Sequence, residues 1–364
     1  MKIIQYFDAR IEHQKALNMI NKVLTIVVPT YNMELYLDRC LSSLIINDEM
    51  IMNSLEVLVV NDGSKDKSSE IAHHYQDKYP QSFRVIDKNN GNYGSCINRG
   101  LKEATGKYIK VLDADDYFDT RQFEHYMNKL STIDVDLVLT DYDFVSESGD
   151  VTGTVTYPFL FEKELSIEEC INNPVFMDIQ MHGVTYKRSN LEKISYIQTE
   201  GISYTDQEWV FIPICTVNRL FYVKNSLYKY LVGRVGQTVD LSVYHKRVRD
   251  REKLVVSMLN SYLEFKKKPT YKKYQSFLDT RIKEALESIY MSYLIVNREL
   301  GDLPLFDTKI QELAPEIHGQ LCNTSVSKFL PYKYIKHWLK TQSLPPVVIS
   351  KAYLFLKKIQ AKLS

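Results

Sequence analysis

Residues 106–119, GKYIKVLDADDYFD, guide the interpretation of the whole chain. Residues 108–112 have the apolar character of a buried strand, and the acidic run at residues 113–116 ends it. Three carboxylates in four residues repel one another, so at the end of an apolar strand they need a cation or several hydrogen-bond donors. Mg²⁺ prefers carboxylate oxygens together with substrate phosphates. The stretch therefore predicts a metal-bridged diphosphate at the carboxyl edge of a sheet.

A structural explanation covers only part of this run. Asp116 or Asp119 could cap a helix that begins near Thr120, because aspartate side chains accept hydrogen bonds from the first backbone N–H groups of a helix. Capping accounts for one carboxylate and leaves the others unexplained.

The composition is that of an ordinary globular protein. The chain has 364 residues, enough for two domains, with 45% hydrophobic and 25% charged residues. A formal net charge of +1 gives no reason to expect nucleic-acid binding. Five scattered cysteines without a CxxC pair favour a reducing compartment. The first residues lack the apolar core of a signal peptide, and no run has the length of a membrane span. We therefore expect a cytoplasmic protein.

Apolar runs alternate with amphipathic stretches through the first 145 residues. The runs predict strands that are buried on both faces, and the stretches between them carry helical stripes, so we expect a parallel sheet with helices on both faces. Ligands of such sheets bind at the carboxyl ends of the strands, where this chain has polar or aromatic side chains. Neither a GxGxxG nor a Walker A sequence follows the first strand. The expected strands are residues 24–28, 55–60, 83–86, 108–112 and 136–139.

Four segments, in this order, resemble glycosyltransferase family 2, the inverting enzymes with the GT-A fold. They are VVPTYNMELYLDRCLSSL, VVNDGSKDKS, DKNNGNYGSCINRGL and GKYIKVLDADDYF, and the resemblance covers about residues 23–235. It implies an α/β fold of GT-A type, a mostly parallel sheet with helices on both faces, plus a C-terminal helical region. We expect an N-terminal extension at residues 1–22, a catalytic domain at 23–235 and a helical region at 236–364.

The resemblance places a nucleotide at the first two strand ends. Thr30, Tyr31 and Glu34 would then lie near uracil and ribose, and Asp62 would accept a hydrogen bond from the base. A carboxylate and an aromatic ring suit uracil, which offers one N–H donor and a flat face. Tyr31 could also be an ordinary turn residue in a chain with 26 tyrosines, and Glu34 a charge in the first turn of a helix.

A glycine-punctuated loop after the third strand resembles the segment that closes over the nucleotide sugar. The resemblance implies nucleotide contacts for Lys88, Asn90 and Gly94, since glycine allows close backbone approach. Asn98 matches the asparagine of the family's arginine–asparagine pair, but Ile97 replaces the arginine, so a neighbouring cation has to supply that charge. A simple left-handed turn explains the loop equally well.

Asp113 and Asp115 match the family's DxD motif. By resemblance, Asp115 holds the metal, Mn²⁺ or Mg²⁺, while Asp113 contacts the ribose or the metal. The cation would neutralise charge on the departing nucleoside diphosphate. We assign the adjacent Asp116 to the sugar side of the site.

Residues 201–213, GISYTDQEWVFIP, resemble the acceptor-side segment that carries the general base. Asp206 would take the proton from an acceptor hydroxyl as that oxygen attacks the anomeric carbon, and a single displacement inverts the configuration. Glu208 is the competing candidate, and Asp206 could instead be a plain N-cap. Trp209 could stack on an acceptor sugar or fill the core.

Two further segments have weaker indications of function. His182 could line the acceptor pocket, although a lone histidine is more often structural. Arg234, Gln237 and His245 lie after Tyr230, in the place where some relatives have a loop that reaches the diphosphate.

Residues 325–364 form a basic amphipathic tail with eight lysines and no carboxylate. Basic helices with interleaved aromatic residues suit an anionic membrane surface, whereas the alternative is a helix packed on the catalytic domain with its lysines in water. We expect peripheral attachment to the inner face of a membrane through this tail, and no nucleic-acid partner, because the chain has no recognised nucleic-acid module. The interleaved aromatic residues are Phe329, Tyr332, Tyr334, Trp338, Tyr353 and Phe355.

These observations predict an inverting, metal-dependent glycosyltransferase. It would move a sugar from a UDP-sugar to a hydroxyl of a glycan or lipid-linked glycan acceptor, with Asp206 as general base. One alternative is a nucleotidyltransferase that makes sugar nucleotides, although such enzymes commonly open with a glycine-rich basic motif. The other is a non-catalytic scaffold that binds nucleotide sugars.

Overall fold

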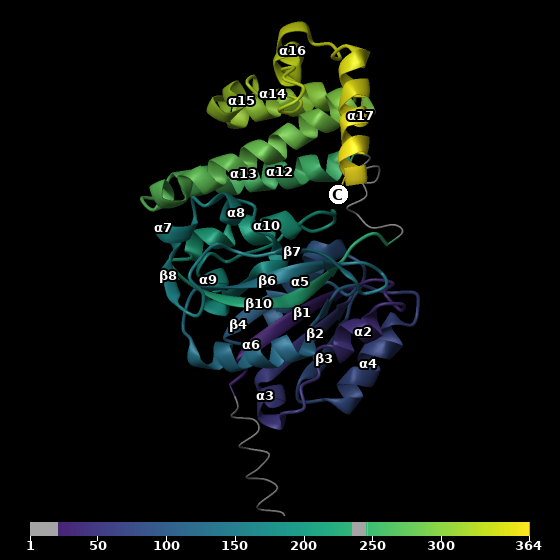
Figure 1. The fold of residues 1–364 in the computed structure, drawn as a ribbon, viewed down its shortest axis with the longest axis vertical. Helices are drawn as coiled ribbons and strands as arrows, with labels where there is room; N and C mark the ends of the chain where they lie inside the picture. Colours follow the sequence, from purple (N-terminus) through teal and green to yellow (C-terminus); the bar gives the residue numbers. More distant parts are fainter. Residues whose placement is uncertain (1–20, 235–244, 246, 364) are drawn as a thin grey trace, which may run out of the picture. The chain divides into compact units, whose positions relative to one another are not determined.

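The computed structural model describes residues 21–234, 245 and 247–363. These residues form two compact units (Figure 1). The first contains the described residues up to Gly201 and from Thr205 to Arg234, and the second contains Ile202–Tyr204 and the described residues after Arg234. Most of the expected N-terminal extension, together with Gln237, lies outside the described residues.

A ten-stranded sheet organises the described part of the first unit, in the order β3-β2-β1-β4-β9-β6-β10-β5. Its first four strands are parallel, as the continuous apolar runs predict, and their carboxyl ends meet at one edge. This edge carries the expected ligand-binding residues. The parallel strands are β1 (Leu24–Thr30), β2 (Leu55–Asn61), β3 (Phe83–Asp87) and β4 (Tyr108–Val111).

The second half of the sheet is mixed. The fifth expected strand, β6, runs from Leu137 to Val145 and does not pair with β4, because the short strand β9 (Val184–Lys187) lies antiparallel between them. β10 (Arg219–Leu231) lies parallel to β6. The GT-A prediction of a mostly parallel sheet is therefore right for the first four strands and for the β6–β10 pair. The remaining strands, all in antiparallel pairs, are β5 (Tyr117–Phe118), β7 (Val151–Val155) and β8 (Glu164–Ser166).

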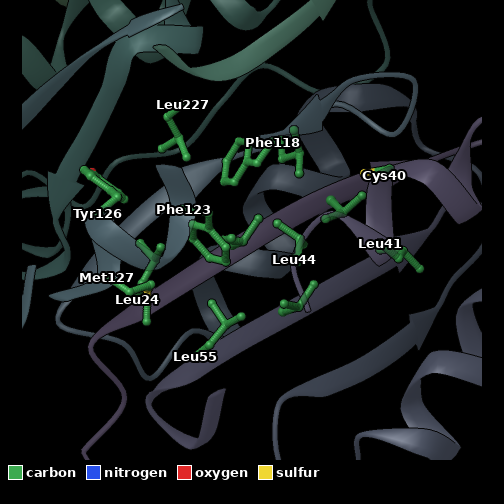
Figure 2. Close-up of a cluster of buried hydrophobic side chains, with 14 of the residues drawn as sticks. Leu24, Cys40, Leu41, Leu44, Leu55, Phe118, Phe123, Tyr126, Met127 and Leu227 are labelled. Atoms are coloured by element: carbon green, nitrogen blue, oxygen red, sulfur yellow. The ribbon is translucent and has the colours of Figure 1, made fainter. Parts of the chain in front are cut away.

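Helices cover both faces of the parallel strands. On one face α2 (Leu37–Ser42), α4 (Ser68–Lys78) and α6 (Thr120–Thr132) pack against alternate residues of β1 and β2 in one apolar cluster, part of which Figure 2 shows. On the other face lies α5 (Asn92–Glu103), which comes so close that a Cβ on Gly100 would be 2.5 Å from Cγ1 of Val27.

Short helices complete the first unit. Asp119 caps α6 by accepting a 3.0 Å hydrogen bond from the Gln122 N–H, so the capping alternative is confirmed for Asp119 and not for Asp116. The short helices are α3 (Glu49–Ser54), α7 (Ile167–Cys170), α8 (Pro174–Met177), η1 (Met181–Gly183), α9 (Arg188–Lys193), α10 (Asp206–Phe211) and η2 (Pro213–Thr216).

The second unit is helical throughout its described residues. The apolar side chains of Ile282, Leu286, Ile289 and Tyr293 are buried in it along one helical stripe. Among these helices, none combines the length and apolar character that crossing a bilayer requires. They are α12 (Val248–Lys266), α13 (Tyr271–Met291), the π-helical turn η3 (Ser292–Asn297), α14 (Leu303–Leu313), α15 (Pro315–Leu321), α16 (Tyr334–Thr341) and α17 (Val347–Leu363).

Candidate active site

The acidic run forms a tight turn directly after β4. The Asp116 N–H donates to the Asp113 carbonyl at 3.0 Å, which closes the turn. The Tyr93 hydroxyl, at the start of α5, donates to Oδ1 of Asp113 at 2.8 Å. Burial and the neighbouring charge of Asp115 raise the pKa of Asp113 to about 7. A cation placed here would relieve this repulsion.

Asp116 joins the acidic turn to the end of β10. Its carboxylate is fully buried, with Oδ2 accepting from the Tyr228 hydroxyl at 2.6 Å and Oδ1 from the Leu231 N–H at 2.7 Å. Burial, followed by the charges of Asp115 and Asp113, raises the pKa of Asp116 well above its usual range. The prediction that Asp116 faces the sugar does not match this placement, because both oxygens are engaged inside the protein.

Asp115 already has a cationic partner. The Arg234 Nε lies 2.7 Å from Oδ2 of Asp115, and the guanidinium also lies over the ring of Tyr36, 5.4 Å from its centroid. Both members of the ion pair are largely buried, with 18% and 14% of their side chains exposed. This pairing shows that a positive charge fits beside Asp115.

A divalent cation fits the residues around the turn. Asp113, Asp116 and His182 each offer one ligand atom, and these atoms lie within 4.8 Å of one another. The Nδ1 atom of buried His182 has no hydrogen-bond partner among the described residues. Burial and the charge of Lys110 lower the pKa of His182 to about 3, so the ring is neutral. Carboxylates with a neutral imidazole suit Mn²⁺, and carboxylates alone suit Mg²⁺.

Lys110 is a site residue that the sequence reasoning missed. It is fully buried in β4, and its Nζ donates to the backbone carbonyls of His182 at 2.7 Å and of Val184 at 3.2 Å. Burial lowers the pKa of Lys110 to about 7. These bonds fix η1, which carries His182 to the acidic turn. The available signal was a single lysine inside an apolar strand, YIKVL.

The loop after β3 is folded around Asp62. Oδ1 of Asp62 accepts from the Lys88 ammonium and, at 2.9 Å, from the Gly91 N–H. The Asn90 amide donates to the Asp62 carbonyl at 3.1 Å, and Lys88 also donates to the Ser95 hydroxyl at 2.8 Å. The structure therefore brings together Asp62, Lys88 and Asn90, three of the residues expected to bind the nucleotide.

The residues after β1 have different surroundings. Tyr31 is 46% exposed, so its ring is accessible for stacking, whereas Thr30 is buried and donates to the Val28 carbonyl at 3.2 Å. Oε2 of Glu34 accepts a 3.0 Å hydrogen bond from the Lys67 N–H just before α4. Glu34 thus ties two loops together and lies ahead of α2, outside its first turn.

A segment at residues 198–200, here called the strap, connects α5 to α10. The Glu208 carboxylate accepts from the backbone N and from Oγ1 of Thr199, both at 2.7 Å. The Asn98 amide donates to the Gln198 carbonyl at 2.8 Å, and its oxygen accepts from the Gln198 N–H at 2.8 Å. Asn98, which resembles the asparagine of the family's arginine–asparagine pair, therefore holds the strap in this structure.

Gly94 is required by the strap and not by a ligand in this structure. A Cβ on Gly94 would lie 2.0 Å from the carbonyl oxygen of Thr199, so any side chain would displace either the strap or the first turn of α5. The strap consequently sets the spacing between the nucleotide loop and α10.

Asp206 begins α10 and lies near the acidic turn. The negative charge of Asp206 helps to raise the pKa of Asp113, after the larger effects of burial and of Asp115. It also helps to raise the pKa of Tyr93, after the larger effects of burial and of Asp113. Trp209, three residues later, is buried edge-to-face against Tyr186 at 5.5 Å between ring centroids. The structure supports the core alternative for Trp209.

These features together define a glycosyltransferase fold of the GT-A type. The structure is similar to that of TarS residues 1–349 from S. aureus in complex with UDP-GlcNAc, with a TM-score of 0.61 and 18% sequence identity, covering 88% of this chain and 92% of that chain. At this identity the likeness concerns the fold.

Sequence comparisons identify the family. Residues 25–195 match the family described as Glycosyl transferase family 2. The uncharacterized glycosyltransferase YibD of Escherichia coli (strain K12) is 30% identical over 226 residues, which are 59% of this chain and 62% of YibD. The minor teichoic acid biosynthesis protein GgaB of Bacillus subtilis (strain 168) is 29% identical over 227 residues, 59% of this chain and 23% of GgaB. Residues 25–195 therefore carry a glycosyltransferase family 2 domain, and the chain spans less than two thirds of these two relatives.

Proposed function

We propose that this protein transfers a sugar from a UDP-sugar to a hydroxyl group of a glycan or lipid-linked glycan, with inversion and with Mn²⁺ or Mg²⁺. The observation that carries the proposal is the convergence of Asp113, Asp115 and Asp206 at the carboxyl edge of the sheet, beside neutral His182. Support also comes from the similar fold of TarS, whose structure contains UDP-GlcNAc.

The chain's own residues have separate roles in this proposal. The exposed ring of Tyr31 stacks on the uracil, and the loop around Asp62 holds the nucleotide. Tyr93 orients the Asp113 carboxylate through its 2.8 Å hydrogen bond. A divalent cation on Asp113 and Asp115 would supply Lewis-acid stabilisation of the departing diphosphate.

Proton transfer falls to Asp206. In the proposed reaction its carboxylate takes the proton of the acceptor hydroxyl as the acceptor oxygen bonds to the anomeric carbon and the bond to UDP breaks. Arg234, which compensates the charge of Asp115 in this structure, would pair with the diphosphate if a metal ion bound Asp115. A single displacement leaves no covalent sugar on the enzyme.

The acceptor and the cellular location are proposed from the name of one relative and from the basic tail. GgaB is named as a minor teichoic acid biosynthesis protein, which supports a cell-surface glycan or its lipid-linked precursor as acceptor. We propose that this protein is in the cytoplasm, peripherally on the inner face of the membrane. The basic tail at residues 325–364 supports this location.

Donor turnover tests the proposal. We expect UDP release from one of UDP-Glc, UDP-Gal, UDP-GlcNAc or UDP-GalNAc in the presence of Mn²⁺, and loss of release with a chelator. Asp206→Asn should abolish turnover while UDP still binds. The matched control is Asp119→Asn, because asparagine also caps helices and α6 stays capped.

Three results would contradict the proposal. Release of pyrophosphate in place of UDP would assign the site to a nucleotidyltransferase. UDP-sugar binding without turnover across the donor and acceptor panel would indicate a scaffold. Turnover by Asp206→Asn at the wild-type rate would remove Asp206 from the general-base role.

A further inference from the structure

The basic C-terminal segment consists of two helices with different surroundings. In α16, Tyr334, Ile335 and Trp338 are buried, and the Tyr334 hydroxyl donates to the Glu287 carbonyl of α13 at 3.0 Å. These aromatic residues are part of the core of the second unit, so they are not available to a lipid surface. α16 is therefore packed, but on α13 of the second unit, whereas the expected alternative was packing on the catalytic domain.

The helix α17 has one packed face and one exposed face (Figure 1). Ser350 is buried on the packed face and accepts a 2.9 Å hydrogen bond from Arg298, while Tyr353 is partly buried beside it. Large apolar side chains point the other way, among them Val348 at 66% and Phe355 at 64% exposure.

The exposed residues of α17 form one continuous surface. A helix advances about 100° per residue, so the exposed residues between Val347 and Ile359, apart from Lys357, fall within an arc of roughly 140°. We call this surface the α17 outer face. Its residues are Val347, Val348, Lys351, Leu354, Phe355, Lys358 and Ile359, all exposed.

The positive charge of the α17 outer face indicates which kind of partner it binds. Lys351 and Lys358 lie within it, and no carboxylate follows Glu316 in the sequence. A second copy of α17 would bring lysines against lysines. An anionic lipid surface accepts both parts of the face, because apolar side chains enter the boundary between headgroups and acyl chains while lysines extend toward phosphates.

We propose that the α17 outer face binds an anionic bilayer surface, with α17 lying in the plane of the membrane and α16 anchoring it to the second unit. The inference rests on the proposed peripheral location and is independent of the proposed sugar transfer. It narrows the contact from a forty-residue tail to one face of one helix.

Vesicle flotation of the full chain tests this surface. The wild type should float with vesicles containing phosphatidylglycerol and should bind pure phosphatidylcholine much more weakly, with binding that falls as salt is added. Lys351→Gln/Lys358→Gln should lower affinity for the anionic vesicles about 30-fold, since each lysine at an anionic surface contributes about a fivefold gain. Val348→Ser/Phe355→Ser should abolish flotation.

A matched control uses another exposed apolar residue. Leu305 in α14 is 75% exposed, so Leu305→Ser removes similar apolar surface elsewhere in the second unit and should leave flotation unchanged. All variants should keep the wild-type melting temperature, because the changed side chains are in solvent.

Flotation and catalysis are separable. UDP release without vesicles should be equal in the wild type and the α17 variants, so absence of turnover would count against the proposed function only. Equal flotation of the wild type and Val348→Ser/Phe355→Ser, or no wild-type binding to anionic vesicles, would overturn the inference. Self-association that Val348→Ser/Phe355→Ser abolishes would also overturn it, by assigning the face to a second copy.

Discussion

The variant Glu208→Gln distinguishes the roles of the two carboxylates of α10. Glu208 is 6% exposed, and its oxygens accept two 2.7 Å hydrogen bonds from Thr199 in the strap. A carboxylate with both oxygens engaged inside the protein is badly placed to take a proton from an acceptor hydroxyl. Glutamine keeps the shape and one acceptor oxygen, so this change removes the charge and retains most of the strap contact.

The size of the effect follows from these two bonds. A hydrogen bond to a charged group contributes about 1.5–3 kcal/mol, and a neutral one about 0.5–1.5 kcal/mol. The glutamine amide can accept from the Thr199 N–H, and the Thr199 hydroxyl can turn to accept from the amide. We therefore expect the free energy of unfolding to fall by about 1–3 kcal/mol, while kcat changes less than about threefold because Asp206 remains.

The assay compares Glu208→Gln with Asp206→Asn. UDP release at saturating donor gives kcat, and urea denaturation gives the free energy of unfolding. Asp206→Asn should lose about 10²–10⁴-fold in kcat with little change in stability. The reasoning is refuted if Glu208→Gln loses as much activity as Asp206→Asn while its stability is that of the wild type, because Glu208 would then be the base.

Two further predictions concern charge. Arg234→Gln should strengthen Mn²⁺ binding to the nucleotide-free protein about 10-fold, because Arg234 forms an ion pair with Asp115 and competes with the metal for this carboxylate. Isothermal titration calorimetry measures the Mn²⁺ affinity. An unchanged affinity would contradict the prediction. Burial and the charge of Arg251 lower the pKa of His245 to about 4. Below the unfolded-state pKa of about 6.5 the unfolded chain binds a proton that the native state does not, so stability should fall by up to about 1.4 kcal/mol per pH unit down to the folded pKa. Thermal melts from pH 7 to pH 5 should show a smaller decline for His245→Gln; parallel curves would argue against this role.

Much of the donor side was predictable because it depends on local pattern and sheet topology. Continuous apolar runs predict buried strands, and parallel strands place their carboxyl ends at one edge. Asp62, Lys88 and Asp113 therefore had to lie along that edge, although they are far apart in sequence. In the structure Asp62 and Lys88 form an ion pair at this edge, a contact that the sequence did not predict.

Contacts that depend on tertiary packing were not predictable. Arg234 and Asp115 are 119 residues apart, and no local pattern pairs them. Lys110 was expected to lie in a strand, but the carbonyls that hold it belong to η1, more than 70 residues later. α16 and α17 have similar basic and aromatic composition, yet Trp338 is buried and Phe355 is exposed, because burial depends on which neighbouring helix covers each face.

Asp116 affects how mutations in the acidic turn should be interpreted. Its two hydrogen bonds fasten the turn to Tyr228 and Leu231, so the loop that carries the DxD motif and the last residues of β10 form a single corner. An alanine scan that found Asp116 indispensable would report on the closure of this corner as well as on any ion that Asp116 helps to bind. Arg234, the last residue of the first unit, follows Leu231 of this corner by three positions, so a change of Asp116 should also disturb the residue that pairs with Asp115.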